Sequence, residues 1–224
     1  MTTDFEKFAI SKGIDSNNVN EYNKHLLKNS YVNPAIIEER RDANMISIDI
    51  FSRLLMDRIL FLGTEVNSDV ANILTAQLLW LEQQSDNDIN LYINSPGGSV
   101  SDGLALIDCM NFIKPSIITT CVGTAASMAA VIFSNGAKGN RHMMEHARFM
   151  IHQVSGGTGR SQCADIQIVA KEMELLQNEL YEILSQNSNL TFDEIKEKAD
   201  RDCWLKAEDA VKYGFADNII KSRK

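Results

Sequence analysis

Ser127 is a residue whose type and surroundings could support nucleophilic catalysis. It follows a run of small residues from Gly123 to Ala126 and precedes an apolar stretch that predicts a buried helix. A serine hydroxyl is a weak nucleophile until a nearby base takes its proton and a carboxylate orients that base. Amides at a helix N-terminus can also stabilise a developing oxyanion. A serine that only caps or packs the helix is the alternative at this point.

His152 is the candidate base, because it ends the apolar run Arg148-Phe-Met-Ile151 that predicts a strand. In a parallel sheet this position lies at the same edge as Ser127. An imidazole is suited to transferring a proton near neutral pH. A hydrogen-bonded structural histidine is the alternative. The other histidines are His25 in the leading segment and His142 and His146 in a polar connection.

Gly97 and Gly98 follow another predicted strand, and glycine lets backbone amides approach a ligand without a Cβ in the way. A double glycine after proline is also common in simple turns. The pattern is not G-x-G-x-x-G, so dinucleotide binding is not indicated. The orienting carboxylate is left open by spacing alone, and the candidates are Asp165, Asp193, Asp200, Asp202 and Asp209.

Alternating strands and helices must position these residues. Apolar runs predict strands at 58–62, 89–93, 117–122 and 148–151. Helices are predicted from an N-cap at Ser68, over 100–113, over 125–135, in an amphipathic stretch from after Gly159 to about 184, from 192 after a capping box of Thr191 and Glu194, and over 207–213 before Gly214. This order predicts an α/β fold with a largely parallel sheet, whose ligands bind at the carboxyl ends of the strands.

The composition excludes several classes of protein. The 224 residues are 44% hydrophobic and 23% charged, which favours a folded core, and the net charge of −8 disfavours nucleic-acid binding. No apolar stretch is long enough to span a membrane, and no secretory signal is recognisable. The four cysteines have irregular spacings, which predicts reduced cytoplasmic thiols and no metal site. We expect an N-terminal extension or propeptide over residues 1–33 and one domain over 34–224.

Four blocks in this order resemble the Clp peptidase family. They are Ile93-Asn-Ser-Pro-Gly-Gly98, Gly123-Thr-Ala-Ala-Ser-Met128, Met150-Ile-His-Gln153 and Asp200-Arg-Asp202. The resemblance extends from about Pro34 to Ile220. It implies the spiral of ββα units that Clp peptidases share with crotonases, with the long helix after Gly159 as a protruding handle.

The same resemblance assigns roles at the site. It implies that Ser127 is the nucleophile, His152 the general base and Asp202 the residue that orients His152. The backbone amides of Gly98 and Met128 would form the oxyanion hole.

The function that the resemblance implies is that of a serine endopeptidase acting on unfolded polypeptides. Two stacked heptameric rings of this chain would enclose a chamber, and a partner AAA+ unfoldase would feed it. Because the sequence has no G-x-x-x-x-G-K-[ST] motif, ATP would be used by the partner, and the chain itself would need no cofactor. Asp200 and Arg201 match a pair that couples rings to the site. Leu79, Tyr92 and Phe112 match a pocket for the unfoldase.

Two alternatives have a different chemistry or none. One is an acyl-CoA hydratase or isomerase of the crotonase type, which has the same fold and a similar oxyanion hole. The other is a catalytically silent ring subunit, which would lack one or more residues of the triad. This sequence contains all three of Ser127, His152 and Asp202.

Overall fold

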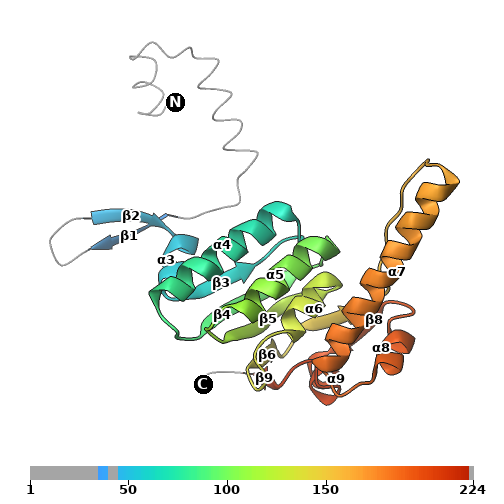
Figure 1. Cartoon of the computed structure of the whole chain (residues 1–224). Helices are drawn as coiled ribbons and strands as arrows, with labels where there is room; N and C mark the ends of the chain where they lie inside the picture. The colour runs from blue at the N-terminus through green and yellow to red at the C-terminus, as the bar shows by residue number, and fades with distance from the viewer. Residues whose placement is uncertain (1–34, 40–44, 222–224) are drawn as a thin grey trace, which may run out of the picture. The chain divides into compact units, whose positions relative to one another are not determined.

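A computed structural model describes residues 35–39 and 45–221 of the chain, which divides into two compact units, Met1–Arg53 and Leu54–Lys224. In the first unit, β1 (Ala35–Glu39) and β2 (Met45–Asp49) pair as an antiparallel hairpin (Figure 1). The helix α3 (Ile50–Met56) follows directly. The predicted boundary after residue 33 lies outside the described residues and stays a prediction.

A seven-stranded sheet is the frame of the second unit. Its order is β3 (Ile59–Leu62), β4 (Ile89–Ser95), β5 (Ile117–Ala126), β6 (Arg141–Met144) and β9 (Asn218–Ile220), with each neighbouring pair parallel. Beyond its pairing with β6, β5 also pairs in parallel with β7 (Arg148–Ile151). The last strand, β8 (Cys203–Lys206), is antiparallel to β7. The predicted α/β fold with a largely parallel sheet is confirmed.

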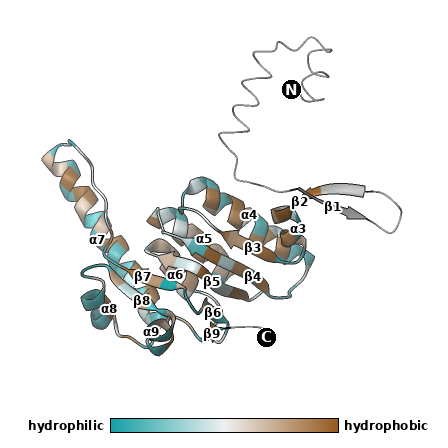
Figure 2. Ribbon diagram, turned by 180° about the vertical axis from the view of Figure 1, so that it is seen from behind, coloured by the Kyte–Doolittle hydropathy of each residue, from teal (hydrophilic) through white to brown (hydrophobic). Residues whose placement is uncertain are grey.

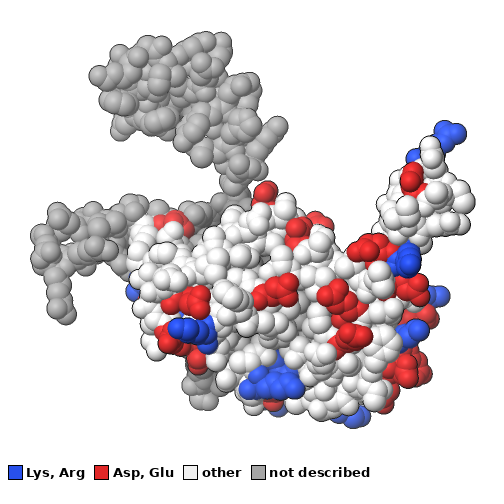
Figure 3. Space-filling view, viewed as in Figure 1, with Lys and Arg blue, Asp and Glu red and all other residues white. Residues whose placement is uncertain are grey.

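Helices connect these strands. Figure 1 shows α4 (Ser68–Gln84), α5 (Val100–Phe112) and α6 (Met128–Ser134) side by side against one face of the sheet. The N-terminal part of α7 (Cys163–Gln186) projects away from the body, as predicted for the handle. The short helices α8 (Phe192–Lys198) and α9 (Ala207–Lys212) are mainly hydrophilic in Figure 2. Acidic side chains lie over the helices on the face shown in Figure 3.

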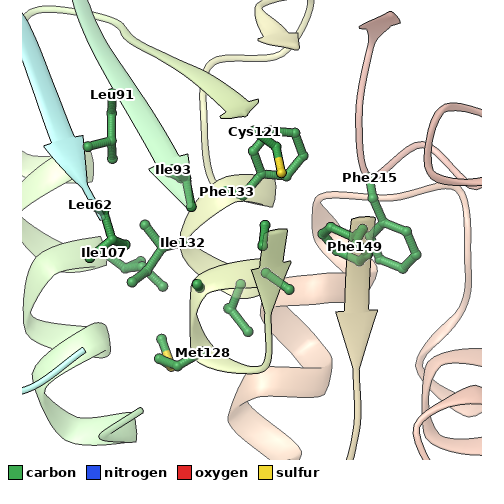
Figure 4. Packing of buried hydrophobic residues seen from close by; sticks show 14 of the residues in the cluster. Leu62, Leu91, Ile93, Ile107, Cys121, Met128, Ile132, Phe133, Phe149 and Phe215 are labelled. Carbon is green, nitrogen blue, oxygen red and sulfur yellow. The ribbon is translucent and has the colours of Figure 1, made fainter. Parts of the chain in front are cut away.

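The core fixes α6 more firmly than the other helices. Each of its residues from Met128 to Ser134 is buried, and Met128, Ile132 and Phe133 lie among the side chains of the neighbouring strands and helices in Figure 4. Phe149 of β7 packs edge-on against Phe133, with ring centroids 6.0 Å apart, and stacks on Phe215 at 4.7 Å. The residue that immediately precedes α6 is therefore held by a close-packed core.

Several predicted boundaries were wrong. Helix α4 is capped by Asn67, whose Oδ1 accepts a hydrogen bond from the Val70 amide at 3.0 Å, rather than by Ser68. The helix predicted from Ala125 begins at Met128, because Ala125 is held in β5 by strands on both sides. The capping box of Thr191 and the helix stop at Gly214, which has φ of +79°, are confirmed. The sequence prediction missed β1, β2, β6, β8 and β9, which have five residues or fewer.

Arg141 and Asp217 tie the C-terminal strand to the rest of the sheet. The Arg141 Nη2 atom lies 2.6 Å from Asp217 Oδ1, and the two side chains are 5% and 19% exposed. Asp217 also accepts hydrogen bonds from the amides of Gly139 and Arg141. Partial burial disfavours the charged carboxylate, but the hydrogen bonds and charge of Arg141 outweigh it, so the pKa of Asp217 is lowered below 3.8.

Replacing Asp217 by Asn should lower the free energy of unfolding by about 3 kcal/mol at pH 7, because Arg141 then keeps a buried charge without its partner. The carboxylate's contribution is complete above the ordinary pKa of 3.8 and disappears as pH falls through the lower folded pKa. Urea titrations at one fixed protein concentration should therefore show a difference between wild type and variant that shrinks in acid. Asp86→Asn, at an exposed position, is the matched control. A difference that does not change between pH 7 and acid would contradict the role of the ion pair.

Candidate active site

Ser127 occupies the junction between β5 and α6 in an uncommon backbone conformation. Its φ is +55° and its ψ is −126°, which is rare for a residue with a side chain and is found most often at functional sites. Its amide donates to the Met150 carbonyl at 2.9 Å, which anchors this conformation to β7. Its side chain makes no capping hydrogen bond to α6, so the alternative of a simple helix cap is wrong.

His152 lies directly against Ser127. Its Nε2 atom is 2.7 Å from Ser127 Oγ, a hydrogen-bond distance. The parallel register of β5 and β7, in which Ala126 is opposite Met150, carries the two residues to the same edge of the sheet. The sequence prediction that this edge brings Ser127 and His152 together is confirmed by the geometry.

Asp202 is placed opposite His152 by the antiparallel pairing of β7 and β8. Ile151 is opposite Cys203, so the next residue outward on each strand faces the other. Asp202 Oδ1 lies 3.5 Å from His152 Nδ1, near enough to favour an imidazolium, though longer than a strong hydrogen bond. The Asp202 side chain is 62% exposed and the His152 side chain 27%, so this end of the chain of contacts is open to water.

The other four candidate carboxylates lie elsewhere. Asp165, Asp193 and Asp209 are in the first turns of α7, α8 and α9, where a negative charge favours the helix dipole. Asp200 accepts a hydrogen bond from Gln153 Nε2 at 2.9 Å. Within the described residues, Asp202 is the one of the five that forms an ion-pair contact with His152. Sequence reasoning missed Gln153, for which the only signal was its place next to His152.

Gly97 and Gly98 approach Ser127 so closely that side chains would not fit. A Cβ on Gly97, which has φ of +93°, would lie 2.6 Å from Ser127 Cβ and 2.9 Å from the Met128 nitrogen. A Cβ on Gly98 would overlap the carbonyl oxygen of Val66. In the part of the chain that the structure describes, the amides of Gly98 and Met128 have no acceptor. Two NH groups near Ser127 are therefore available to an oxyanion.

A cavity of about 50 Å³ opens beside the Ser127 hydroxyl. Besides Gly98, Ser127 and His152, apolar side chains form much of its wall, and they are Val100, Met128, Val131, Leu180 and Leu184. A nucleophile, a base, unpaired amides and an adjacent binding cavity together suit acyl transfer through a tetrahedral intermediate.

No helix among the described residues is long and apolar enough to cross a membrane, and no three His, Cys, Asp or Glu side chains converge there as metal ligands. The four cysteines are free thiols, of which Cys109 and Cys121 are buried. Burial raises the pKa of Cys121 to about 11 despite a hydrogen bond from the Gly123 backbone, so this thiol is unreactive at neutral pH.

Comparison with known proteins gives one consistent result. The sequence model of the family described as Clp protease matches residues 41–223. A protein of Bacteroides fragilis named ATP-dependent Clp protease proteolytic subunit is 48% identical over 85% of this chain and 91% of its own length. Proteins of the same name from Bacteroides thetaiotaomicron and Porphyromonas gingivalis are 48% and 42% identical, over 85% and 99% of this chain and 86% and 99% of their own lengths. The hydratase or isomerase alternative gains no support from these matches.

Replacing Gly97 by Ala should displace Ser127 and slow its covalent labelling by a fluorophosphonate about 10²-fold, because the added Cβ overlaps the Ser127 backbone and side chain. The measurement is the rate of labelling under pseudo-first-order conditions. Gly139→Ala is a matched control, since Gly139 has a similar φ of +90° but no atom within 4 Å of the added Cβ. Equal labelling rates for the two variants would contradict the importance of the close approach.

Proposed function

The chain belongs to the Clp protease family, and from this membership we propose that it is the proteolytic subunit of an ATP-dependent Clp protease. In this role it is a serine endopeptidase that hydrolyses unfolded polypeptides. The observation that carries the proposal is the 2.7 Å contact between Ser127 Oγ and His152 Nε2, which pairs a nucleophile with a base at the edge of the sheet. The name shared by the relatives from three bacteria supports it.

The proposed reaction has two acyl-transfer steps. His152 takes the Ser127 proton as Oγ attacks a peptide carbonyl carbon, and the resulting tetrahedral intermediate carries its negative charge on the former carbonyl oxygen. The imidazolium then protonates the leaving amine, the C–N bond breaks and an ester to Ser127 remains. Water, deprotonated by His152, attacks the ester, and the carboxylic acid product leaves as Ser127 recovers its proton.

Backbone and carboxylate groups stabilise the charges that develop in this reaction. We assign the amides of Gly98 and Met128 to the oxyanion, which their lack of other acceptors supports. We assign Asp202 to the imidazolium, because its carboxylate is 3.5 Å from the second ring nitrogen. These protein groups supply the nucleophile, the base and the oxyanion donors, so the mechanism needs no metal or other cofactor.

ATP belongs to a partner in this proposal. The relatives are named ATP-dependent, whereas this sequence contains no G-x-x-x-x-G-K-[ST] loop to bind the nucleotide phosphates. We therefore propose an AAA+ unfoldase that delivers unfolded chains to the peptidase. Exposed apolar side chains on the outer helices support a docking surface for it, with Leu79 41% and Phe112 78% exposed, while Tyr92 stacks on Phe61 at 5.3 Å.

The proposed assembly is a pair of stacked heptameric rings that encloses the active sites. Ile166, Ile168 and Leu175 on the projecting helix α7 are 46%, 67% and 55% exposed, and these apolar side chains would gain stability by packing against another subunit. Asp200 and Arg201 are the proposed link between the rings and the site, which suits the position of Asp200 next to Gln153. The net charge of −8 disfavours nucleic acid as a partner, and four free thiols favour a cytoplasmic location.

Replacing Ser127 by Ala should lower the hydrolysis of a short fluorogenic peptide by at least about 10³-fold, because no other hydroxyl can form the acyl-enzyme. Ser101→Ala, on the exposed surface of α5, is the matched control and should keep the wild-type kcat/KM. Undiminished cleavage by the Ser127 variant would refute the proposed nucleophile and leave a silent ring subunit as the better account.

Replacing Asp202 by Asn should lower kcat by at least about 10²-fold, because the neutral amide no longer stabilises the imidazolium of His152. Asp200→Asn is the matched comparison, since it removes a carboxylate that contacts Gln153 rather than His152 and should cost much less. Both variants are to be assayed on the same peptide at the same state of assembly. If only the Asp200 variant loses activity, Asp202 is not the orienting carboxylate.

A further inference from the structure

Tyr181 carries a buried hydroxyl with no partner. The residue is 2% exposed, and its oxygen is one of the two buried side-chain N or O atoms without a hydrogen bond in the described residues. Leaving such a group unpaired destabilises the folded chain by about 1–3 kcal/mol relative to a satisfied one. An orphaned group of this kind in a close-packed protein needs an explanation, and a bound molecule that supplies the partner is one.

The position of Tyr181 supplies that explanation. Its side chain lines the cavity beside Ser127 together with Leu180 and Leu184 of the same helix. The other polar members of the wall are accounted for, since Ser127 and His152 pair with each other and Gln153 bonds to Asp200. Ser155, which also lines the cavity, is exposed to water. Tyr181 is therefore the buried polar residue of this cavity with a free hydrogen-bonding group.

The hydroxyl is fixed in place and stays protonated. The ring of Tyr181 packs edge-on against Phe192 of α8, with centroids 5.9 Å apart and an interplanar angle of 70°. Burial, followed by the negative charge of Asp200, raises the pKa of Tyr181 above its ordinary value of 10.0. A neutral phenol can donate one hydrogen bond and also accept one, so it can pair with an amide group of either orientation.

We propose that Tyr181 is a specificity-determining residue whose hydroxyl forms a hydrogen bond with the substrate side chain that enters this cavity. That side chain belongs to the residue whose carbonyl Ser127 attacks, because the cavity opens next to Ser127 Oγ. The inference rests on the proposed peptidase function and deepens it.

The chemistry of the cavity selects the kind of substrate side chain. Apolar walls from Val100, Met128 and Val131 favour an unbranched aliphatic stem and would destabilise a full charge that lacked an ionic partner. The Tyr181 hydroxyl adds a requirement for a neutral polar tip. Glutamine combines the two properties, and norleucine has a stem of similar length without the polar tip. The preferred substrates are thus polypeptides with glutamine on the acyl side of the cleaved bond.

The test compares two fluorogenic peptides that differ only at the attacked residue, one with glutamine and one with norleucine. Tyr181→Phe should lower kcat/KM for the glutamine peptide about 10-fold, because the amide loses its partner, and should change the value for norleucine less than about 2-fold. Tyr213→Phe makes the same chemical change in a tyrosine that does not line the cavity and should leave the ratio unchanged. Fragments of an unfolded protein, mapped by mass spectrometry, should show fewer cuts after glutamine with the Tyr181 variant.

The outcomes distinguish this inference from the proposed function. If the wild type cleaves both peptides and Tyr181→Phe changes neither or changes both equally, the hydroxyl does not determine specificity and the inference fails alone. An equal loss together with a lower melting temperature identifies a structural role and also overturns it. If the wild type cleaves neither peptide nor an unfolded protein, the proposed function fails, and this inference fails with it.

Discussion

The double pairing at the carboxyl end of β5 is the constraint on which the site depends. Ala125 is opposite Ser95 of β4 on one side and opposite Phe149 of β7 on the other. This register leaves Ser127 as the first residue beyond the strand and brings His152 to the same edge. A slip of one residue would reverse the sides to which successive side chains point and would separate the hydroxyl from the imidazole. The 2.7 Å contact is therefore a consequence of backbone pairing.

Two parts of the site differ in how firmly they are held. Ser127 is fixed by the buried helix α6 behind it, by the amide bond to Met150 and by the close approach of Gly97. Asp202 stands at the end of a four-residue strand and is 62% exposed, with one 3.5 Å contact to His152. The nucleophile and oxyanion donors are thus built into the core. The carboxylate lies beside Asp200 and Arg201, where a neighbouring subunit could change its position.

The sequence predicts the rigid part of this site better than the peripheral part. Ser127, His152 and the glycine pair follow strands whose apolar runs are recognisable, so their meeting at one sheet edge could be inferred from periodicity. Spacing did not select Asp202, because β8 has only four residues and too little alternation to indicate a strand. The unpaired hydroxyl of Tyr181 was also out of reach, since the apolar stripe of α7 does not reveal which polar atoms lack partners. Here the family resemblance supplied Asp202, and only the three-dimensional structure revealed Tyr181.

The late position of β8 in the chain affects how activity arises during synthesis. Ser127 and His152 leave the ribosome before the segment from Asp202 to Lys206 that completes the pairing with β7. The strand β9 and its Arg141–Asp217 ion pair follow later still. A nascent chain therefore contains the nucleophile and base well before it can orient the imidazole or close the sheet. The order of residues in this fold delays the complete triad until synthesis is nearly finished, which limits premature cleavage of neighbouring nascent chains.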